Sequence, residues 1–187
     1  MVHPLSFLSK AFAWSWGVGG VLLLCGRAVW ALVPKVIQAF DQSLSPLQIG
    51  AALGWIGFMA YFEGYRGFQK AFAPRVVART QYLAQNPGAL ELILAPMFAM
   101  GLIRATKKRL LVSWWLLIGV SSLVLMVRLL PQPWRGLVDA GVVLGLSWGC
   151  IAIVAWCVAA WRGIEIPISR DLPSDEVTTP LPTPPDQ

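Results

Sequence analysis

The sequence predicts an all-α integral membrane protein, with four transmembrane helices and one short interfacial or re-entrant helix. Two observations support this fold class. Apolar residues make up 57% of the chain and charged residues only 13%, with a mean hydropathy of +0.64, and a water-soluble domain could not bury that much apolar surface. In addition, several apolar runs reach about twenty residues, the length that spans a hydrocarbon core of about 30 Å as a helix.

Four such runs are expected to cross the membrane, and they cover residues 12–33, 47–68, 110–130 and 134–161. The first run is too long for the apolar region of a signal peptide and no A-x-A cleavage site follows it, so we expect it to remain as a span. Residues 33–41 alternate apolar and polar side chains at helical spacing, which indicates a short amphipathic turn at the outer surface. A capping box is expected to start the second run, because Ser45 and Gln48 flank Pro46.

A shorter apolar segment, residues 89–103, reads ALELILAPMFAMGLI. Its fifteen residues would cover only about 22 Å as a helix. If it crossed the bilayer, the cations on its two sides would face opposite membrane surfaces and one cluster would break the positive-inside rule. We therefore favour an interfacial or re-entrant helix, which leaves both clusters on the cytoplasmic side. A fifth span is the alternative.

The distribution of lysine and arginine orients this four-span arrangement. With both termini in the cytoplasm, eleven of the fifteen cations lie on the cytoplasmic side, as the positive-inside rule requires: Lys10, Arg66, Lys70, Arg75, Arg79, Arg104, Lys107, Lys108, Arg109, Arg162 and Arg170. We expect a bacterial inner-membrane protein whose cytoplasmic face contacts anionic lipid headgroups. Residues 1–163 form the helical membrane domain, and residues 164–187, rich in proline and acidic side chains, are expected to be a disordered cytoplasmic tail.

Glycines recur at helical spacing in two of the predicted spans and indicate close helix contacts. One set lies on the second span and the other on the fourth: Gly50, Gly54 and Gly57, and Gly141, Gly145 and Gly149. The set on the fourth span is the strongest packing signal in the chain. Spacing alone does not tell whether it meets the second span of the same chain or another copy.

Residues 61–79 combine aromatic and charged side chains at the end of the second run. On a helical wheel at about 100° per residue, the aromatic side chains form one stripe and the charged side chains another, almost opposite: Tyr61, Tyr65, Phe68 and Phe72, and Glu63, Arg66 and Lys70. The structural interpretation is a packing face with cations in the headgroups, in which Glu63 pairs with Arg66 one turn on. The functional interpretation is a polar interface site at Glu63, Arg66 and Lys70.

Arg27 and Asp139 form a candidate charge pair within the membrane. Helix rise places Arg27 about 10 Å below Pro34 and Asp139 about 8 Å below Trp134, and Arg27 shares a helix face with Gly17 and Gly20. The pair would fix the first span against the fourth, or else serve as a proton or anion relay.

Motifs of enzyme chemistry are absent from the sequence. His3 is the single histidine, which excludes paired-histidine haem ligation and H-E-x-x-H zinc chemistry within this chain. Cys25, Cys150 and Cys157 are interpreted as small buried apolar residues. The net charge of +6 reflects membrane topology rather than nucleic-acid binding. We therefore expect no enzyme, no catalytic residues, no metal and no cofactor.

These features favour a small multispanning membrane protein that acts as a subunit or as an assembly or scaffold factor of a membrane complex. It would act through its helix-packing faces and its basic cytoplasmic surface. The expected partners are the lipid bilayer and another membrane protein, or a second copy of this chain. The alternative is a small transporter or channel-forming homo-oligomer, although the spans offer few polar side chains to line a pore. A lipid-handling enzyme has the least support, because no catalytic pair is evident.

Overall fold

A computed structural model of the chain describes residues 4–173 and is all-helical within that range, as predicted. Three helices are long and apolar enough to cross a membrane: residues 10–40 of the first helix, α6 and α7. The elements are α1 (Pro4–Phe40), α2 (Pro46–Met59), the π-helix η1 (Ala60–Phe72), α3 (Ala73–Gln85), α4 (Ala89–Ile93), α5 (Ala95–Ala99), α6 (Lys107–Val127) and α7 (Trp134–Trp161).

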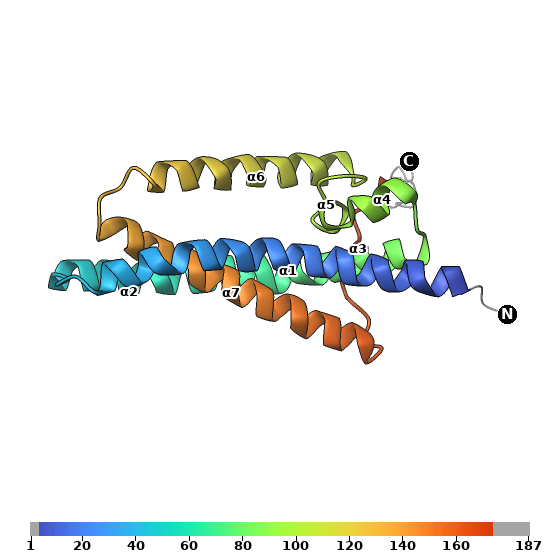
Figure 1. The fold of residues 1–187 in the computed structure, drawn as a ribbon, viewed down its shortest axis with the longest axis horizontal. Helices are drawn as coiled ribbons and strands as arrows, with labels where there is room; N and C mark the ends of the chain where they lie inside the picture. The colour runs from blue at the N-terminus through green and yellow to red at the C-terminus, as the bar shows by residue number, and fades with distance from the viewer. Residues whose placement is uncertain (1–3, 174–187) are drawn as a thin grey trace, which may run out of the picture.

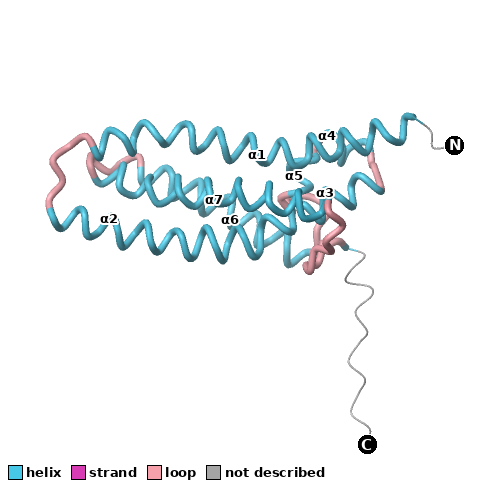
Figure 2. Tube along the Cα trace, turned by 90° about the horizontal axis from the view of Figure 1, so that it is seen from below, coloured by secondary structure: helices cyan, strands magenta, loops and turns pink. Residues whose placement is uncertain are grey.

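The long helices lie side by side as an elongated bundle (Figures 1 and 2). The chain runs along the bundle in α1, returns through α2, η1 and α3, and then passes along it twice more in α6 and α7. Both ends of the described chain therefore lie at one end of the bundle, together with α4, α5 and the start of α6 (Figure 1). We call this the N-terminal end. The loops at residues 41–45 and 128–133 lie at the opposite end.

The first helix is longer than the sequence predicted. It continues through Pro34 to Phe40, so the expected amphipathic turn at residues 33–41 is the last part of α1 and not a separate element. Ala39 in this part is fully buried and would meet any side chain added at Gly136 of α7. The predicted capping box is confirmed: Gln48 N donates to Ser45 Oγ at 3.3 Å, and Ser45 N donates to Gln48 Oε1 at 2.8 Å.

The segment predicted as one short helix forms two, α4 and α5, which are separated at Leu94. They pack against α1, where Pro96 touches Gly20, and they stay at the N-terminal end of the bundle (Figure 1). The end of α3 and the start of α6 therefore lie at the same end. The chain does not cross the bundle between them.

Helix α7 is the centre of the bundle, because α1, α2, η1 and α3 all pack against it. Its glycine face meets α2 and η1 of the same chain. A Cβ atom at Gly141, Gly145 or Gly149 would lie 2.5 Å from Trp55, 2.7 Å from Glu63 or 2.5 Å from Phe68, respectively. Only glycine permits this approach.

The glycines of α2 behave differently. No atom lies within 4 Å of a Cβ built at Gly50, Gly54 or Gly57. The packing face predicted on α2 is therefore not used within residues 4–173. Helix α2 meets α7 through another face, where Trp55 Nε1 donates to the carbonyl of Val138 at 3.0 Å.

Arg79 of α3 ties the connections at the N-terminal end together. Its side chain is fully buried and stacks over the Phe98 ring, with the guanidinium carbon 4.3 Å from the ring centroid. It donates to the carbonyl oxygens of Phe98 (2.6 Å), Arg170 (2.7 Å), Ile103 (2.9 Å) and Arg104 (3.0 Å). One guanidinium thus satisfies backbone acceptors from three separate stretches of chain.

Residues 164–173 belong to the segment for which disorder was predicted, but they are held against the bundle. Arg75 Nε lies 2.9 Å from Asp171 Oδ2, and Leu172 is buried beside Ala13, Leu83 and Phe98. The proline and acidic content of this segment suggested disorder. The donors that hold it belong to α3, and the sequence alone does not show that pairing. Residues 174–187 lie outside the described range.

Helix α6 stands apart from the other long helices (Figure 1). Along its 21 residues only Ser113 and Val127 are buried. Its hydrogen bonds to other elements lie near its start, where Trp114 Nε1 donates to Leu102 O at 3.2 Å. Beyond this point, apolar side chains are exposed on all its sides.

The contact between the glycine face of α7 and η1 can be tested with a pair of matched glycine substitutions. Gly149→Leu should destabilise the protein by about 1–3 kcal/mol, because the new side chain must displace Phe68 in a packed interface. Gly54→Leu places the same side chain in open space and should change the free energy of unfolding by no more than about 0.5 kcal/mol. Unfolding of the purified protein in mixed micelles measures both. Equal losses would mean that α7 does not pack on η1 as described.

Candidate functional site

Glu63 lies on η1, a π-helix of 13 residues. Hydrogen bonds in a π-helix join residues i and i+5, and π-helical turns occur frequently at functional sites. The i,i+5 pairs accordingly share a face: Glu63 and Phe68 face Gly145 and Gly149 of α7. The next pair, Gly64 and Gln69, meets the Trp148 side chain in the same way.

This geometry corrects the helical-wheel prediction. At 100° per residue, Glu63 and Phe68 belonged to stripes almost opposite each other, whereas both side chains contact α7. The wheel assumed an α-helix, and a π-turn shifts the residues that follow. The predicted aromatic stripe is also divided, because Tyr61 is exposed while Phe72 packs against the core of the bundle.

Glu63 is half-buried where η1 faces α7, and one oxygen of its carboxyl group is inaccessible. Its Oε2 atom has no hydrogen-bond partner among the described residues and lies 2.7 Å from the position of a Cβ atom at Gly145. The thiols of Cys25 on α1 and Cys150 on α7 contact each other, and Cys25 is close enough to Glu63 to interact with it electrostatically. The sequence predicted these cysteines to be separate apolar residues. No local pattern indicates that α1 and α7 bring them together beside a carboxyl group.

The level of Glu63 along the bundle also differs from the prediction, which placed it near the membrane boundary. Its neighbour Gly145 is eleven residues from Trp134 and sixteen from Trp161 within α7. At 1.5 Å per residue these separations are about 16 Å and 24 Å. Glu63 therefore lies level with the central part of a helix long and apolar enough to cross a membrane.

Arg66 and Lys70 do not join Glu63 in one polar site. Both side chains are exposed, and neither forms an ion pair with Glu63 within the described structure. The ammonium group of Lys70 instead lies 4.5 Å from the centroid of the Tyr65 ring. An i,i+3 pair requires α-helical spacing, which η1 does not have.

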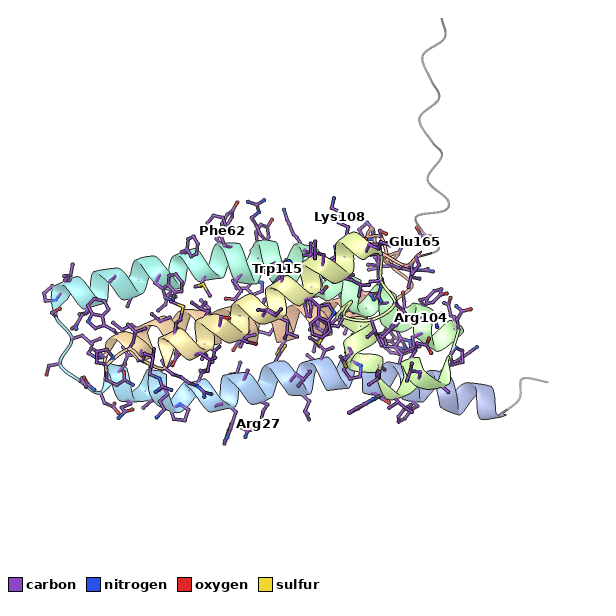
Figure 3. The ribbon with its side chains drawn as sticks, turned by 90° about the horizontal axis from the view of Figure 1, so that it is seen from above. Arg27, Phe62, Arg104, Lys108, Trp115 and Glu165 are labelled. Carbon is purple, nitrogen blue, oxygen red and sulfur yellow. The ribbon has the colours of Figure 1, made fainter. Side chains whose placement is uncertain are left out.

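Arg27 and Asp139 are not brought together either. Arg27 is exposed and points away from the bundle (Figure 3), whereas Asp139 is buried and has Arg135 Nε 3.9 Å from its Oδ2 atom. The face of α1 that carries Arg27 is covered at Gly17 by Thr80 and at Gly20 by Pro96. Those covering elements, α3 and α5, lie at the N-terminal end and leave the same face free at Arg27.

A second polar region lies at the N-terminal end of the bundle. Arg104 pairs with Glu91 there, beside a pocket of about 510 Å³ that is also lined by Tyr82, Phe98 and Leu172. Arg109 and Arg75 share Asp171, at 4.0 Å and 2.9 Å. The sequence assigned these cations to lipid headgroups, and their acidic partners are too distant along the chain for any local pattern to show the pairing.

Among the described residues, no three His, Cys, Asp or Glu side chains lie together in an arrangement that could hold a metal ion. Comparison of the chain with protein-family models, with curated proteins and with solved structures gives no match.

The partner of Asp139 can be tested with two double-mutant cycles. Arg135→Gln and Asp139→Asn should couple by about 0.5–1 kcal/mol, because each removes the same partly buried ion pair. Arg27→Gln and Asp139→Asn should add to within about 0.3 kcal/mol, since the two residues do not meet. Free energies of unfolding in mixed micelles measure both cycles. Stronger coupling for Arg27 than for Arg135 would contradict the observed packing.

Proposed function

We propose that the chain is a small inner-membrane protein with four spans, in which α2 and η1 together supply the span that follows α1. Continuity of the helical path from Pro46 to Gln85 supports this count, as does the alternating course of the four long passes along the bundle (Figures 1 and 2). Both termini and α4–α5 then belong to the cytoplasmic side, with α4 and α5 in the interface.

The charges support this orientation. Arg104 and Lys108 project at the N-terminal end of the bundle, as does Glu165 (Figure 3), and Lys107 is exposed beside them. A basic surface at this end satisfies the positive-inside rule and suits contact with anionic headgroups.

Within that membrane arrangement, we propose that the protein is a subunit or an assembly or scaffold factor of a membrane complex. The observation that carries this proposal is the isolation of α6. Beyond its first two turns, α6 exposes apolar side chains on all its sides and packs little against the rest of the described structure, so most of its surface is open to other molecules. The open glycine face of α2 adds a second surface on which another helix could approach closely. We propose a helix of another membrane protein as the partner of α6.

A second candidate, a small transporter or channel-forming homo-oligomer, is favoured by one observation. Within the described residues, one oxygen of the half-buried Glu63 is inaccessible and no cation pairs with this side chain, and uncompensated charged groups at membrane depth frequently mark ion pathways.

The topology can be tested by labelling single cysteines in a background that lacks Cys25, Cys150 and Cys157. Gln85→Cys and Lys108→Cys should react with an impermeant maleimide from the cytoplasmic side, and Ser43→Cys only from the opposite side, because the two membrane surfaces carry opposite ends of the bundle. All three positions are exposed or at exposed loops. Reaction of Gln85→Cys and Lys108→Cys from different sides would establish a fifth span.

The partner of α6 can be tested by photocrosslinking in cells, with a benzophenone side chain in place of Ile118. This position lies on α6 and is exposed, so irradiation should join it to a different membrane protein, which mass spectrometry of the native complex in mild detergent then identifies. The matched control is Ile151, an exposed residue of α7, which should give lipid adducts only. An adduct of two copies of this chain would favour the channel-forming alternative, and lipid adducts alone at both positions would contradict the subunit role.

A further inference from the structure

Within the described structure, Glu63 differs from the other buried or half-buried carboxylates because it has no cation beside it. Glu91 pairs with Arg104, Asp171 with Arg75, and Asp139 has Arg135 at 3.9 Å. For Glu63 no cation lies within ion-pairing distance, and its Oε2 atom is inaccessible and accepts no hydrogen bond. The arrangement therefore buries one oxygen of this half-buried side chain without compensating its charge.

The groups that face Glu63 do not provide that compensation. Cys25 on α1 and Cys150 on α7 offer thiols, which are weak donors and weak acceptors. Gly145 offers no side chain, and Arg66, the cation one turn along η1, is exposed to the outside of the bundle. An ionised carboxylate in such surroundings loses its hydration without a replacement, which favours the neutral acid.

The protonation state of Glu63 affects the packing of η1 on α7 as well as the local charge, because of where the carboxyl group lies. Glu63 fills the space left by the missing side chain of Gly145, one turn from the contact between Phe68 and Gly149. An anion at this point would be driven towards water, and that movement would separate η1 from α7. The neutral acid can remain where it is.

We propose that Glu63 is a proton-binding site inside the helix bundle, and that its bound proton holds η1 against the glycine face of α7. The ligand is a proton, taken up by the Glu63 carboxylate when η1 packs on α7 and released when η1 moves away. This site goes beyond the proposed subunit role and does not depend on it, because the proton is bound by residues of this chain alone.

The experiment uses the full-length protein in phospholipid vesicles and the apolar reagent dicyclohexylcarbodiimide, which reacts with protonated carboxyl groups in apolar surroundings. Mass spectrometry should find one adduct, on Glu63, and the adduct should form more slowly as the pH is raised, because the reactive neutral acid is depleted. A water-soluble carbodiimide with an amine nucleophile should modify the exposed Glu165 and leave Glu63 unmodified.

Two variants make the assignment specific. Glu63→Gln removes the acid while keeping its shape, and it should lose the adduct. Asp139→Asn changes another enclosed carboxyl group, one beside a cation, and should keep the adduct on Glu63. An adduct that persists in Glu63→Gln, or forms on Asp139 in place of Glu63, would overturn the proposal.

An infrared difference spectrum provides a measurement that does not depend on reagent access. The wild-type protein at neutral pH should show a carboxylic C=O stretching band that is absent in Glu63→Gln. If both variants fold and the two spectra show only ionised carboxylate, Glu63 carries no proton and the proposal fails. The partner experiment on Ile118 can succeed or fail independently of this result.

Discussion

The architecture depends on the close contact between the glycine face of α7 and the continuous rod of α2 and η1. Three glycines, one helical turn apart, allow Trp55, Glu63 and Phe68 to occupy positions where any other residue would place a Cβ atom. One α-turn of α7, from Gly145 to Gly149, is matched by one π-turn of η1, from Glu63 to Phe68. The π-helix allows the contacts of Glu63 with Gly145 and of Phe68 with Gly149 to form together. Helices α1 and α3 pack against the same central helix.

Much of the framework could be predicted from local sequence, because apolar length, glycine spacing and the Ser45 capping box are determined within a few residues of one another. The glycine face of α7 was visible for this reason, although its partner was not. The π-helix could not be predicted, since the residues of η1 have no local pattern that distinguishes a π-turn from an α-turn. Its geometry is set by packing against α7, and this moved Glu63 from a predicted surface pair with Arg66 to the inside of the bundle.

Charged residues were the least predictable part of the structure, because their partners are distant in sequence. Arg79 was counted among the headgroup-facing cations, yet it is fully buried and donates to carbonyl groups up to 92 residues away. Those contacts also explain why residues 164–173 are ordered despite a composition typical of disorder. Arg27 and Asp139 show the opposite error. Similar depth on two helices suggested a pair, but depth says nothing about how each helix is rotated.

The central position of α7 has a consequence for how the protein is made. In the proposed four-span arrangement, α6 needs no neighbour to enter the bilayer, because its apolar surface is sufficient by itself. The α2–η1 rod is different, since Glu63, Arg66 and Lys70 raise the cost of its insertion and the helix that accepts Glu63 is synthesised some seventy residues later. The contact of the second span with α7 can form only after α7 has been synthesised, so in this arrangement the second span lacks its partner helix during that interval.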